Sequence, residues 1–172
     1  MFELVTANGA SAAGNVQENI IRAVAEIEAA CFSMPLTREQ ISRMLLDEQI
    51  CWILLWEKDE ASPADGVGHA PSSGEAELAG YVWAQTVLDE GYIGNVAVRP
   101  ASRRRSGGDL LLEALDSLAK EKHLAFLTLE VRAGNAPAIA LYEKHGYRRT
   151  GLRPGYYSAP REDALLMTKE FS

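Results

Sequence analysis

The sequence predicts a mixed α/β fold, in which a central sheet of parallel and antiparallel strands is flanked by helices. Residues 50–56 form a continuous apolar run that is too short for a typical helix, which indicates a buried strand. Residues 78–98 hold two strand-like segments around a Leu-Asp-Glu-Gly turn, which favours an antiparallel hairpin. Residues 109–122 have helical spacing and lie between two strands, so those strands should be parallel neighbours.

The elements of the first half follow from apolar spacing and capping patterns. Residues 2–6 are consistent with a short strand, and apolar residues recur at helical spacing over residues 16–31. Thr37 stands three positions before Gln40, the capping-box pattern, which indicates the start of a second, short helix. Residues 57–77 are rich in Glu, Asp, Pro, Gly, Ser and Ala and hold almost no large apolar side chain. We therefore expect an inserted, mobile loop there.

In the second half the pattern is strand, Arg/Gly-rich loop, helix, strand and helix. The helix at 109–122 carries an acidic residue in its first turn and two lysines in its last, as the helix dipole favours. A strand over residues 124–131 follows it. Asn135 then suits an N-cap, Pro137 is tolerated in a first turn, and Gly146 suits the C′ position that ends the last helix.

Composition restricts the classes of function. With 172 residues, 47% hydrophobic and 24% charged, we expect one domain over residues 1–172. The net charge of −7 argues against direct nucleic-acid binding, which needs basic surface. The sequence shows neither a signal-like start nor an apolar run of membrane-spanning length, so we expect a cytoplasmic protein without a membrane partner. Cys31 and Cys51 lack the spacing of metal ligands, and we predict no metal site and no disulfide framework.

The loop before the helix at 109–122 reads Arg103-Arg104-Arg105-Ser106-Gly107-Gly108. Glycines let a backbone approach a ligand closely, and the free N–H groups and dipole of a helix start favour anions, so the loop suits a pyrophosphate. The loop is explained equally well as an exposed basic turn, in which the glycines are needed only because the backbone adopts positive φ. The patterns of a Walker loop and of a dinucleotide-binding fingerprint are both absent, which disfavours those two nucleotide sites.

Several motifs of the second half together resemble the GNAT superfamily of acetyltransferases. They are Asn95-Val96-Ala97-Val98 at a strand end, the Arg/Gly loop, Leu129-Glu130-Val131-Arg132 on the next strand, and Asn-x-x-Ala-Ile-x-Leu-Tyr-Glu-x-x-Gly-Tyr from Asn135 to Tyr147. Within that superfamily the chain is similar to the RimI family, which acetylates the N-terminal alanine of a ribosomal protein. Val87-Leu88-Asp89-Glu90 and Gly155-Tyr156-Tyr157 add to this narrower resemblance. The match covers nearly the whole chain outside the inserted loop and the N-terminal loop.

The resemblance implies a mixed sheet whose two central parallel strands splay apart, with acetyl-CoA in the gap between them. The strand ending at Val98 would meet the acetyl and pantetheine portions with its backbone, the Arg/Gly loop would wrap the pyrophosphate, and Asn135 would touch the cofactor's arm. The cofactor-binding residues implied in this way are Val96, Ala97, Val98, Arg104, Arg105, Ser106, Gly107, Gly108, Asp109 and Asn135.

Acetyl transfer to an amine needs a neutral nucleophile, stabilisation of the oxyanion and a proton for the departing thiolate. The resemblance implies that Glu130 accepts the amine's proton through water, that Tyr142 donates to the thiolate, and that a backbone N–H of residues 96–98 holds the oxyanion. Taken singly, Glu130 is explained more simply as a carboxylate paired with an arginine, and Tyr142 as a core residue with its hydroxyl at the surface. Their joint position in one motif favours catalysis.

One residue departs from the family pattern, and several functions stay open. Ser106 stands where the family loop usually has glycine, and a positive φ there would cost about 1 kcal/mol. The leading acceptor is the N-terminal α-amine of a protein or peptide, with a ribosomal protein as the partner that the resemblance implies. The alternatives are a small amine, a lysine side chain or an antibiotic as acceptor, and a non-catalytic acyl-CoA-binding module. Tyr156 and Tyr157 suit either an acceptor groove or packing between strands.

Overall fold

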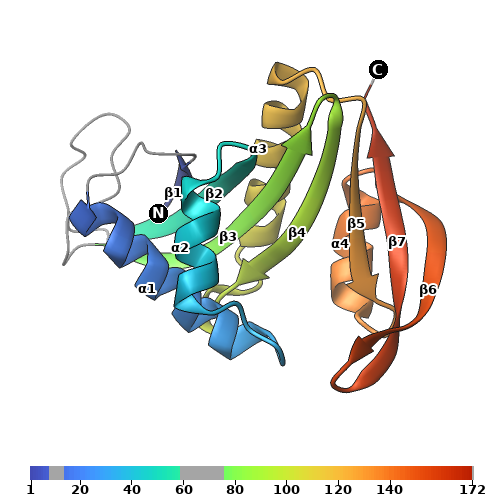
Figure 1. Cartoon of the computed structure of the whole chain (residues 1–172), viewed down its shortest axis with the longest axis horizontal. Coiled ribbons are helices and arrows are strands. Elements are labelled where there is room, and N and C mark those ends of the chain that lie inside the picture. The colour runs from blue at the N-terminus through green and yellow to red at the C-terminus, as the bar shows by residue number, and fades with distance from the viewer. Residues whose placement is uncertain (8–13, 59–75, 172) are drawn as a thin grey trace.

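A computed structural model describes residues 1–7, 14–58 and 76–171 of the chain (Figure 1). In these residues a seven-stranded mixed sheet has the order β1-β2-β3-β4-β5-β7-β6, and β4–β5 is its parallel pair. The strands are β1 (Phe2–Ala7), β2 (Ile50–Lys58), β3 (Ala76–Val87), β4 (Glu90–Val98), β5 (Phe126–Arg132), β6 (Arg148–Ser158) and β7 (Arg161–Glu170). The helices are α1 (Gly14–Cys31), α2 (Arg38–Leu46), α3 (Gly107–Glu121) and α4 (Ala136–Lys144), with a 3₁₀ turn at Pro100–Ser102. The predicted mixed α/β class is confirmed.

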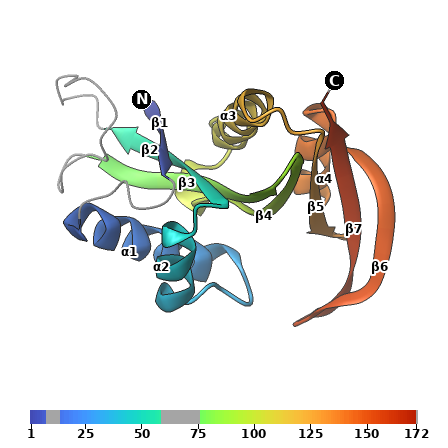
Figure 2. The same cartoon turned by 45° about the horizontal axis from the view of Figure 1, so that its top comes forward.

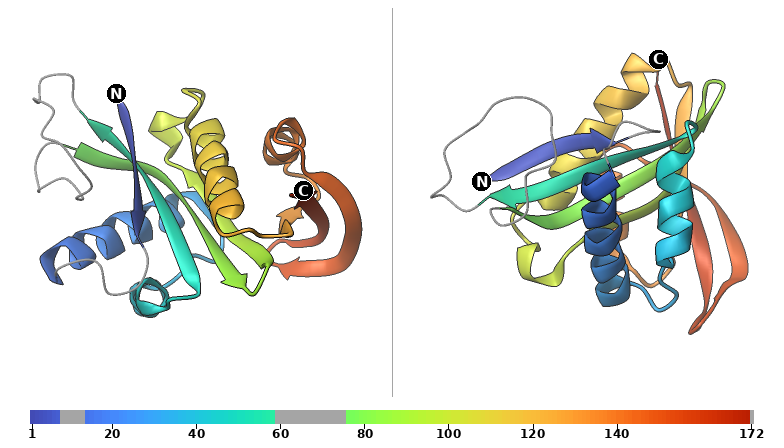
Figure 3. Two further views of the ribbon diagram at one scale, coloured as in Figure 1. Left: turned by 90° about the horizontal axis from the view of Figure 1, so that it is seen from above. Right: turned by 60° about the vertical axis from the view of Figure 1, so that its left-hand side comes forward.

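Helices cover both faces of the sheet (Figures 2 and 3). Helices α1 and α2 lie on one face, and α3 and α4 lie on the other. Alternation along β5 produces the two sides: Leu127, Leu129 and Val131 join the core under α3 and α4, while Thr128 and Glu130 point to the opposite face. No helix in the described ranges is long and apolar enough to cross a membrane.

Local capping places the ends of α2 and α4 as the sequence predicts. Thr37 Oγ1 accepts from the Gln40 N–H at 3.2 Å, and Gln40 Oε1 accepts from the Thr37 N–H at 2.8 Å, a complete capping box. At the start of α4, Asn135 Oδ1 accepts from the Ala138 N–H at 3.3 Å. Gly146 follows α4 with a φ of +86°, the left-handed conformation in which glycine carries no steric penalty.

The expected loop at 57–77 is shorter at both ends than the sequence predicts. Glu57 pairs with Glu77, and Lys58 pairs with Ala76, so β2 and β3 continue into the segment. Composition misses these pairs because backbone hydrogen bonds extend a hairpin without large apolar side chains. The rest of the predicted insertion, residues 59–75, lies outside the described residues.

The parallel strands β4 and β5 separate halfway along their length. They pair only where Glu90–Ile93 face Phe126–Leu129. Gly94 is then left out of the β3–β4 register as a bulge, and a Cβ at this position would lie 1.8 Å from the Trp83 ring. Beyond the bulge β4 stays with β3 and β5 stays with β7, so the two strands diverge (Figure 1). The predicted splay is confirmed.

Candidate active site

Two hollows open where β4 and β5 separate. The larger, here the α3 groove, has a volume of about 570 Å³ and lies between the outer half of β4, the start of α3 and one side of α4. Its lining residues are Cys31, Phe32, Val96, Ala97, Val98, Arg103, Arg104, Ser106, Gly107, Gly108, Asp109, Asn135, Pro137, Ala138, Leu141 and Tyr142. Nine of the ten predicted cofactor-binding residues are in this set, and Arg105 is not.

The start of α3 is shaped for an anion. Ser106 is the N-cap residue with a φ of 61° and makes no capping hydrogen bond with its side chain. The first amides of a helix lack intrahelical acceptors, so they stay open to a ligand and carry the positive end of the dipole. Close packing explains both glycines, because a Cβ at Gly107 would lie 3.1 Å from Leu55 and one at Gly108 would lie 2.8 Å from Leu141. These features fit a pyrophosphate.

The arginines of the loop divide between two tasks. Arg104, with a φ of 62°, lines the α3 groove, and so does Arg103, which the prediction did not include. Arg103 Nε donates to the Val98 carbonyl at 3.0 Å and thereby ties the loop to the end of β4. Arg105 instead pairs with Glu57 and lies over the Phe2 ring. The sequence of three consecutive arginines does not show which of them faces the groove. That depends on where β1 and β2 lie, because these strands carry the partners of Arg105.

Asp109 contributes to the α3 groove as a paired carboxylate. Lys144 Nζ lies 2.6 Å from Asp109 Oδ1, and His145 Nε2 lies 2.8 Å from the same oxygen. Hydrogen bonds from Lys144 and then His145 hold the pKa of Asp109 below its usual value. The negative charge is thus compensated next to the anion-binding helix start.

The smaller hollow, here the β5 groove, has a volume of about 270 Å³. It lies between β5, the bulged part of β4, and residues 32–36, the segment between α1 and α2 that we name the α1–α2 loop. Its lining residues are Cys31, Phe32, Ser33, Met34, Gly94, Asn95, Val96, Glu130, Val131, Arg132, Asn135, Ala138, Tyr142 and Tyr157. Tyr157 thus lines a groove. Tyr156 packs its ring edge-on against the Tyr157 ring and is 47% exposed.

At the rim of the β5 groove, the α1–α2 loop contacts the turn joining β6 to β7. Ser33 Oγ donates to the Ala159 carbonyl at 2.6 Å. Arg132 Nη2 donates to the same carbonyl at 3.0 Å and lies 3.3 Å from Ser33 Oγ. The Arg132 guanidinium also stacks 4.2 Å from the centroid of the Tyr157 ring. Segments far apart in sequence therefore meet over the groove.

Glu130 points into the β5 groove with one oxygen paired and one free. Its side chain is 9% exposed, and Oε1 lies 3.3 Å from Arg153 Nη1. Oε2 is buried and has no hydrogen-bond partner among the described residues. The Tyr92 hydroxyl lies close by: burial, and then the Glu130 carboxylate, raises the pKa of Tyr92. A buried, unpartnered carboxylate oxygen is costly, and it is placed to accept a proton or hydrogen bond from a ligand.

Tyr142 stands where the two grooves meet. It lines both of them from α4, and its ring packs edge-on against Tyr147 with centroids 5.7 Å apart. Burial raises the pKa of Tyr142, so the phenol stays protonated at neutral pH. Asn135 also lines both grooves, with its side-chain oxygen committed to the cap of α4. The structure therefore brings Glu130, Tyr142 and Asn135 to one place.

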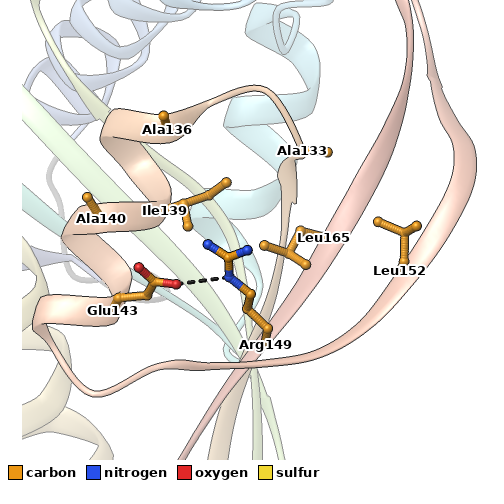
Figure 4. A pocket seen from close by; sticks show the side chains of 8 residues that line it. All are labelled: Ala133, Ala136, Ile139, Ala140, Glu143, Arg149, Leu152 and Leu165. Carbon is orange, nitrogen blue, oxygen red and sulfur yellow. Dashed lines mark hydrogen bonds and ion pairs between the residues drawn. The ribbon is translucent and has the colours of Figure 1, made fainter.

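A third hollow, of about 350 Å³, lies on the other side of α4, against β6 and β7 (Figure 4). Arg149 reaches across it and donates from Nε to Glu143 at 2.9 Å. The rest of its lining is mostly alanine, isoleucine and leucine, and none of the predicted site residues belongs to it. The described residues also contain no cluster of His, Cys, Asp and Glu that could hold a metal ion.

Comparison with known proteins identifies the class that this fold and site define. The sequence pattern of the acetyltransferase (GNAT) family matches residues 21–147, and the chain belongs to that family. Acetyl-CoA is the acetyl donor of such enzymes, and the open start of α3 and the long α3 groove fit its pyrophosphate and pantetheine arm.

Individual relatives narrow the class to N-acetyltransferases. The chain is 37% identical, over 91% of its length and 93% of the relative's, to a Bacillus subtilis protein provisionally named [ribosomal protein bS18]-alanine N-acetyltransferase. It is 42% identical to the Escherichia coli [ribosomal protein bS18]-alanine N-acetyltransferase over 56% of this chain and 66% of that one. The crystal structure of the Escherichia coli ribosomal-protein-S18-alanine N-acetyltransferase superimposes with a TM-score of 0.77 at 28% identity, covering 100% of this chain and 95% of the other.

Proposed function

We propose that this protein transfers the acetyl group of acetyl-CoA to the N-terminal α-amine of a protein, and that its acceptor is the N-terminal alanine of ribosomal protein bS18. The observation that carries the proposal is the meeting of the two grooves at Tyr142, together with the unpartnered Oε2 of Glu130 in the β5 groove. The names of the relatives in Bacillus subtilis and Escherichia coli support the choice of acceptor.

The α3 groove holds the donor. The amides at the start of α3 and the guanidinium of Arg104 receive the pyrophosphate, and the outer half of β4 follows the pantetheine arm. Because β5 no longer pairs with β4 beyond Ile93, the edge of β4 that faces β5 offers unused backbone groups to the thioester. One such N–H, between Val96 and Val98, stabilises the oxyanion that forms during transfer.

The β5 groove holds the acceptor. At its rim the hydrogen bond from Ser33 to Ala159 joins two segments, and this bridge favours entry of a chain end over the middle of a polypeptide. An α-amine is therefore favoured over a side chain in a folded segment. The free oxygen of Glu130 provides an acceptor for an ammonium group in the groove.

The chemistry divides between the two predicted catalytic residues. Glu130 takes a proton from the acceptor ammonium, directly or through water, and the neutral amine attacks the thioester carbon. An α-amine has a pKa near 8, so little driving force is needed for this step. As the C–S bond breaks, Tyr142 gives its phenolic proton to the CoA thiolate, and the second proton that the attacking nitrogen loses as the amide forms passes through water to the Tyr142 phenolate. The raised pKa of Tyr142 keeps the phenolic proton in place until the thiolate forms.

The test is a single-turnover assay with acetyl-CoA and a synthetic peptide that copies the alanine-initiated N-terminus of bS18. Tandem mass spectrometry should find one added acetyl group on the α-amine. Two matched peptides serve as controls, one with a blocked α-amine and an internal lysine, and one with proline in place of the first alanine. Both should stay unmodified.

The alternatives give different products in the same experiment. Acetylation of the blocked peptide on lysine, or of small amines and aminoglycosides without acetylation of the alanine peptide, contradicts the α-amine proposal. Failure of the protein to bind acetyl-CoA in isothermal titration calorimetry contradicts enzymatic transfer altogether.

A further inference from the structure

A buried carboxylate that takes no part in the proposed chemistry lies beneath the β5 groove. Glu28, on the inner face of α1, is 0% exposed. Burying a charge is costly unless several hydrogen bonds compensate it, so a carboxylate in this position indicates a specific task. Among the described residues that line the two grooves, Asn95 is the one whose side chain hydrogen-bonds to Glu28.

Three donors from three segments meet on this carboxylate. The Tyr81 hydroxyl on β3 and Asn95 Nδ2 on β4 both donate to Oε1, the latter at 2.6 Å. The backbone N–H of Leu36 donates to Oε2 at 2.8 Å. A carboxylate is the side chain suited to this task because it offers two oxygens and no hydrogen; glutamine would present an NH₂ group to one of the donors.

One of the three donors lines the β5 groove, and a second belongs to the loop that forms one of its walls. Leu36 ends the α1–α2 loop, which lines the groove with Phe32, Ser33 and Met34. Asn95 follows the Gly94 bulge, where β4 leaves β5, and lines the opposite wall. Glu28 therefore spans the base of the groove and fixes the separation between its walls. Tyr81, the third donor, lines neither groove.

We propose that Glu28 is a positioning residue for the acceptor: it holds the α1–α2 loop and Asn95 at the separation that the acceptor peptide requires. The proposal rests on the function proposed above. The α1–α2 loop is thereby fixed at two points, from beneath by Glu28 and at the rim by the hydrogen bond between Ser33 and Ala159. In the described structure the Glu28 side chain makes no hydrogen bond to the residues that line the α3 groove, so the donor site should not depend on it.

The test separates acceptor binding from donor binding and from folding. In Glu28→Gln the KM for the alanine peptide should rise about tenfold, equivalent to ~1.4 kcal/mol. The kcat and the KM for acetyl-CoA should stay within about twofold of wild type. Amide exchange of Leu36, followed by NMR without substrate, should accelerate, because its N–H loses a charged acceptor.

Two control variants distinguish positioning from stability. Tyr81→Phe removes another hydrogen bond to the same carboxylate without touching the α1–α2 loop, so Tm should fall while the acceptor KM stays at the wild-type value. Glu26→Gln changes an exposed acid on the same helix that pairs with Arg99, and it should alter neither quantity.

A Glu28→Gln variant with wild-type acceptor KM and wild-type Leu36 exchange overturns the inference, as does a Tyr81→Phe variant with the same tenfold rise. If Glu28→Gln does not fold, Glu28→Asp carries the same measurements, because it keeps the charge but withdraws the oxygens by one methylene. Wild-type protein that does not acetylate the peptide refutes the proposed function instead, and the Leu36 exchange still reports on the role of Glu28 in fixing the loop.

Discussion

The α3 groove and the β5 groove are built in different ways. The floor of the α3 groove is a continuous stretch of chain, in which the end of β4 leads through the Arg/Gly loop into the first turn of α3. The β5 groove is assembled from segments up to 126 residues apart, as in the contact between Ser33 and Ala159, and side chains hold it together.

Specificity can therefore vary more easily in one groove than in the other. Under the proposed function, the groove built mainly on one continuous stretch of chain binds the constant donor, and few contacts between distant segments shape it. The groove built from tertiary side-chain contacts binds the acceptor, so substitutions at its rim or base can alter it without loss of the donor site. Single substitutions in each groove test this division.

Replacing the acceptor-side base should have the largest effect. Glu130→Gln keeps the shape of the side chain but removes the proton acceptor, so kcat/KM for the alanine peptide should fall by about 10²–10⁴-fold. Acetyl-CoA affinity, measured by calorimetry, should be unchanged because Glu130 lies outside the α3 groove. Glu143→Gln, at an acid outside both grooves, is the control and should keep wild-type activity. Equal activity in the two variants would refute the role of Glu130.

Replacing Tyr142, which lies where the two grooves meet, should have the next largest effect. Tyr142→Phe removes the proton donor, and kcat should fall about 10²-fold in stopped-flow or coupled thiol assays. Because burial raises the pKa of Tyr142, the wild-type kcat should show no loss from its ionisation up to about pH 10. Tyr147→Phe is the matched control, since the Tyr147 hydroxyl has no partner among the described residues. A decline of kcat near pH 8 that Tyr142→Phe abolishes would contradict the raised pKa.

Arg104 and Arg105 should differ in how much each contributes to acetyl-CoA binding. Arg104→Ala removes a cation from the groove, and the KM for acetyl-CoA should rise about tenfold, as the loss of one charge-assisted hydrogen bond predicts. Arg105→Ala should leave that KM within about twofold, because Arg105 pairs with Glu57 outside the groove. Dissociation constants for CoA, measured by calorimetry, check both. Equal losses in the two variants would show that Arg105 also reaches the cofactor.

The smallest effect concerns the residue that departs from the family pattern. Ser106 has a φ of 61°, so Ser106→Gly should raise the free energy of unfolding by ~0.5–1 kcal/mol in urea titrations. Ser106→Ala keeps the Cβ and should give no such gain, which separates backbone strain from loss of the hydroxyl. Destabilisation by Ser106→Gly would mean that the serine hydroxyl contributes more than its backbone conformation costs.

The features that the sequence predicts best are those set by interactions between residues close together in the chain. The capping box at Thr37, the Asn135 cap and the glycine after α4 each depend on neighbours within about four residues, and the structure confirms all three. The end of β4, the Arg/Gly loop and the first turn of α3 form one motif continuous in sequence. That continuity is why eight of the ten predicted cofactor residues lie together, and Asn135 joins them from the start of α4. The catalytic roles of Glu130 and Tyr142 stay predictions until the variants are measured.

The sequence by its own patterns predicts the helices, their caps, the strands as far as β5 apart from the ends of β2 and β3, and the Arg/Gly motif of the α3 groove, because these depend on short-range backbone geometry and apolar periodicity. Three features could be seen only in the folded chain: Arg105 pairs with Glu57, Tyr157 rather than Tyr156 lines the β5 groove, and Glu28 bonds to segments on both sides of that groove. These outcomes depend on which distant segments fold against one another. A side chain's partner across the sheet is fixed by packing, and no local pattern records it.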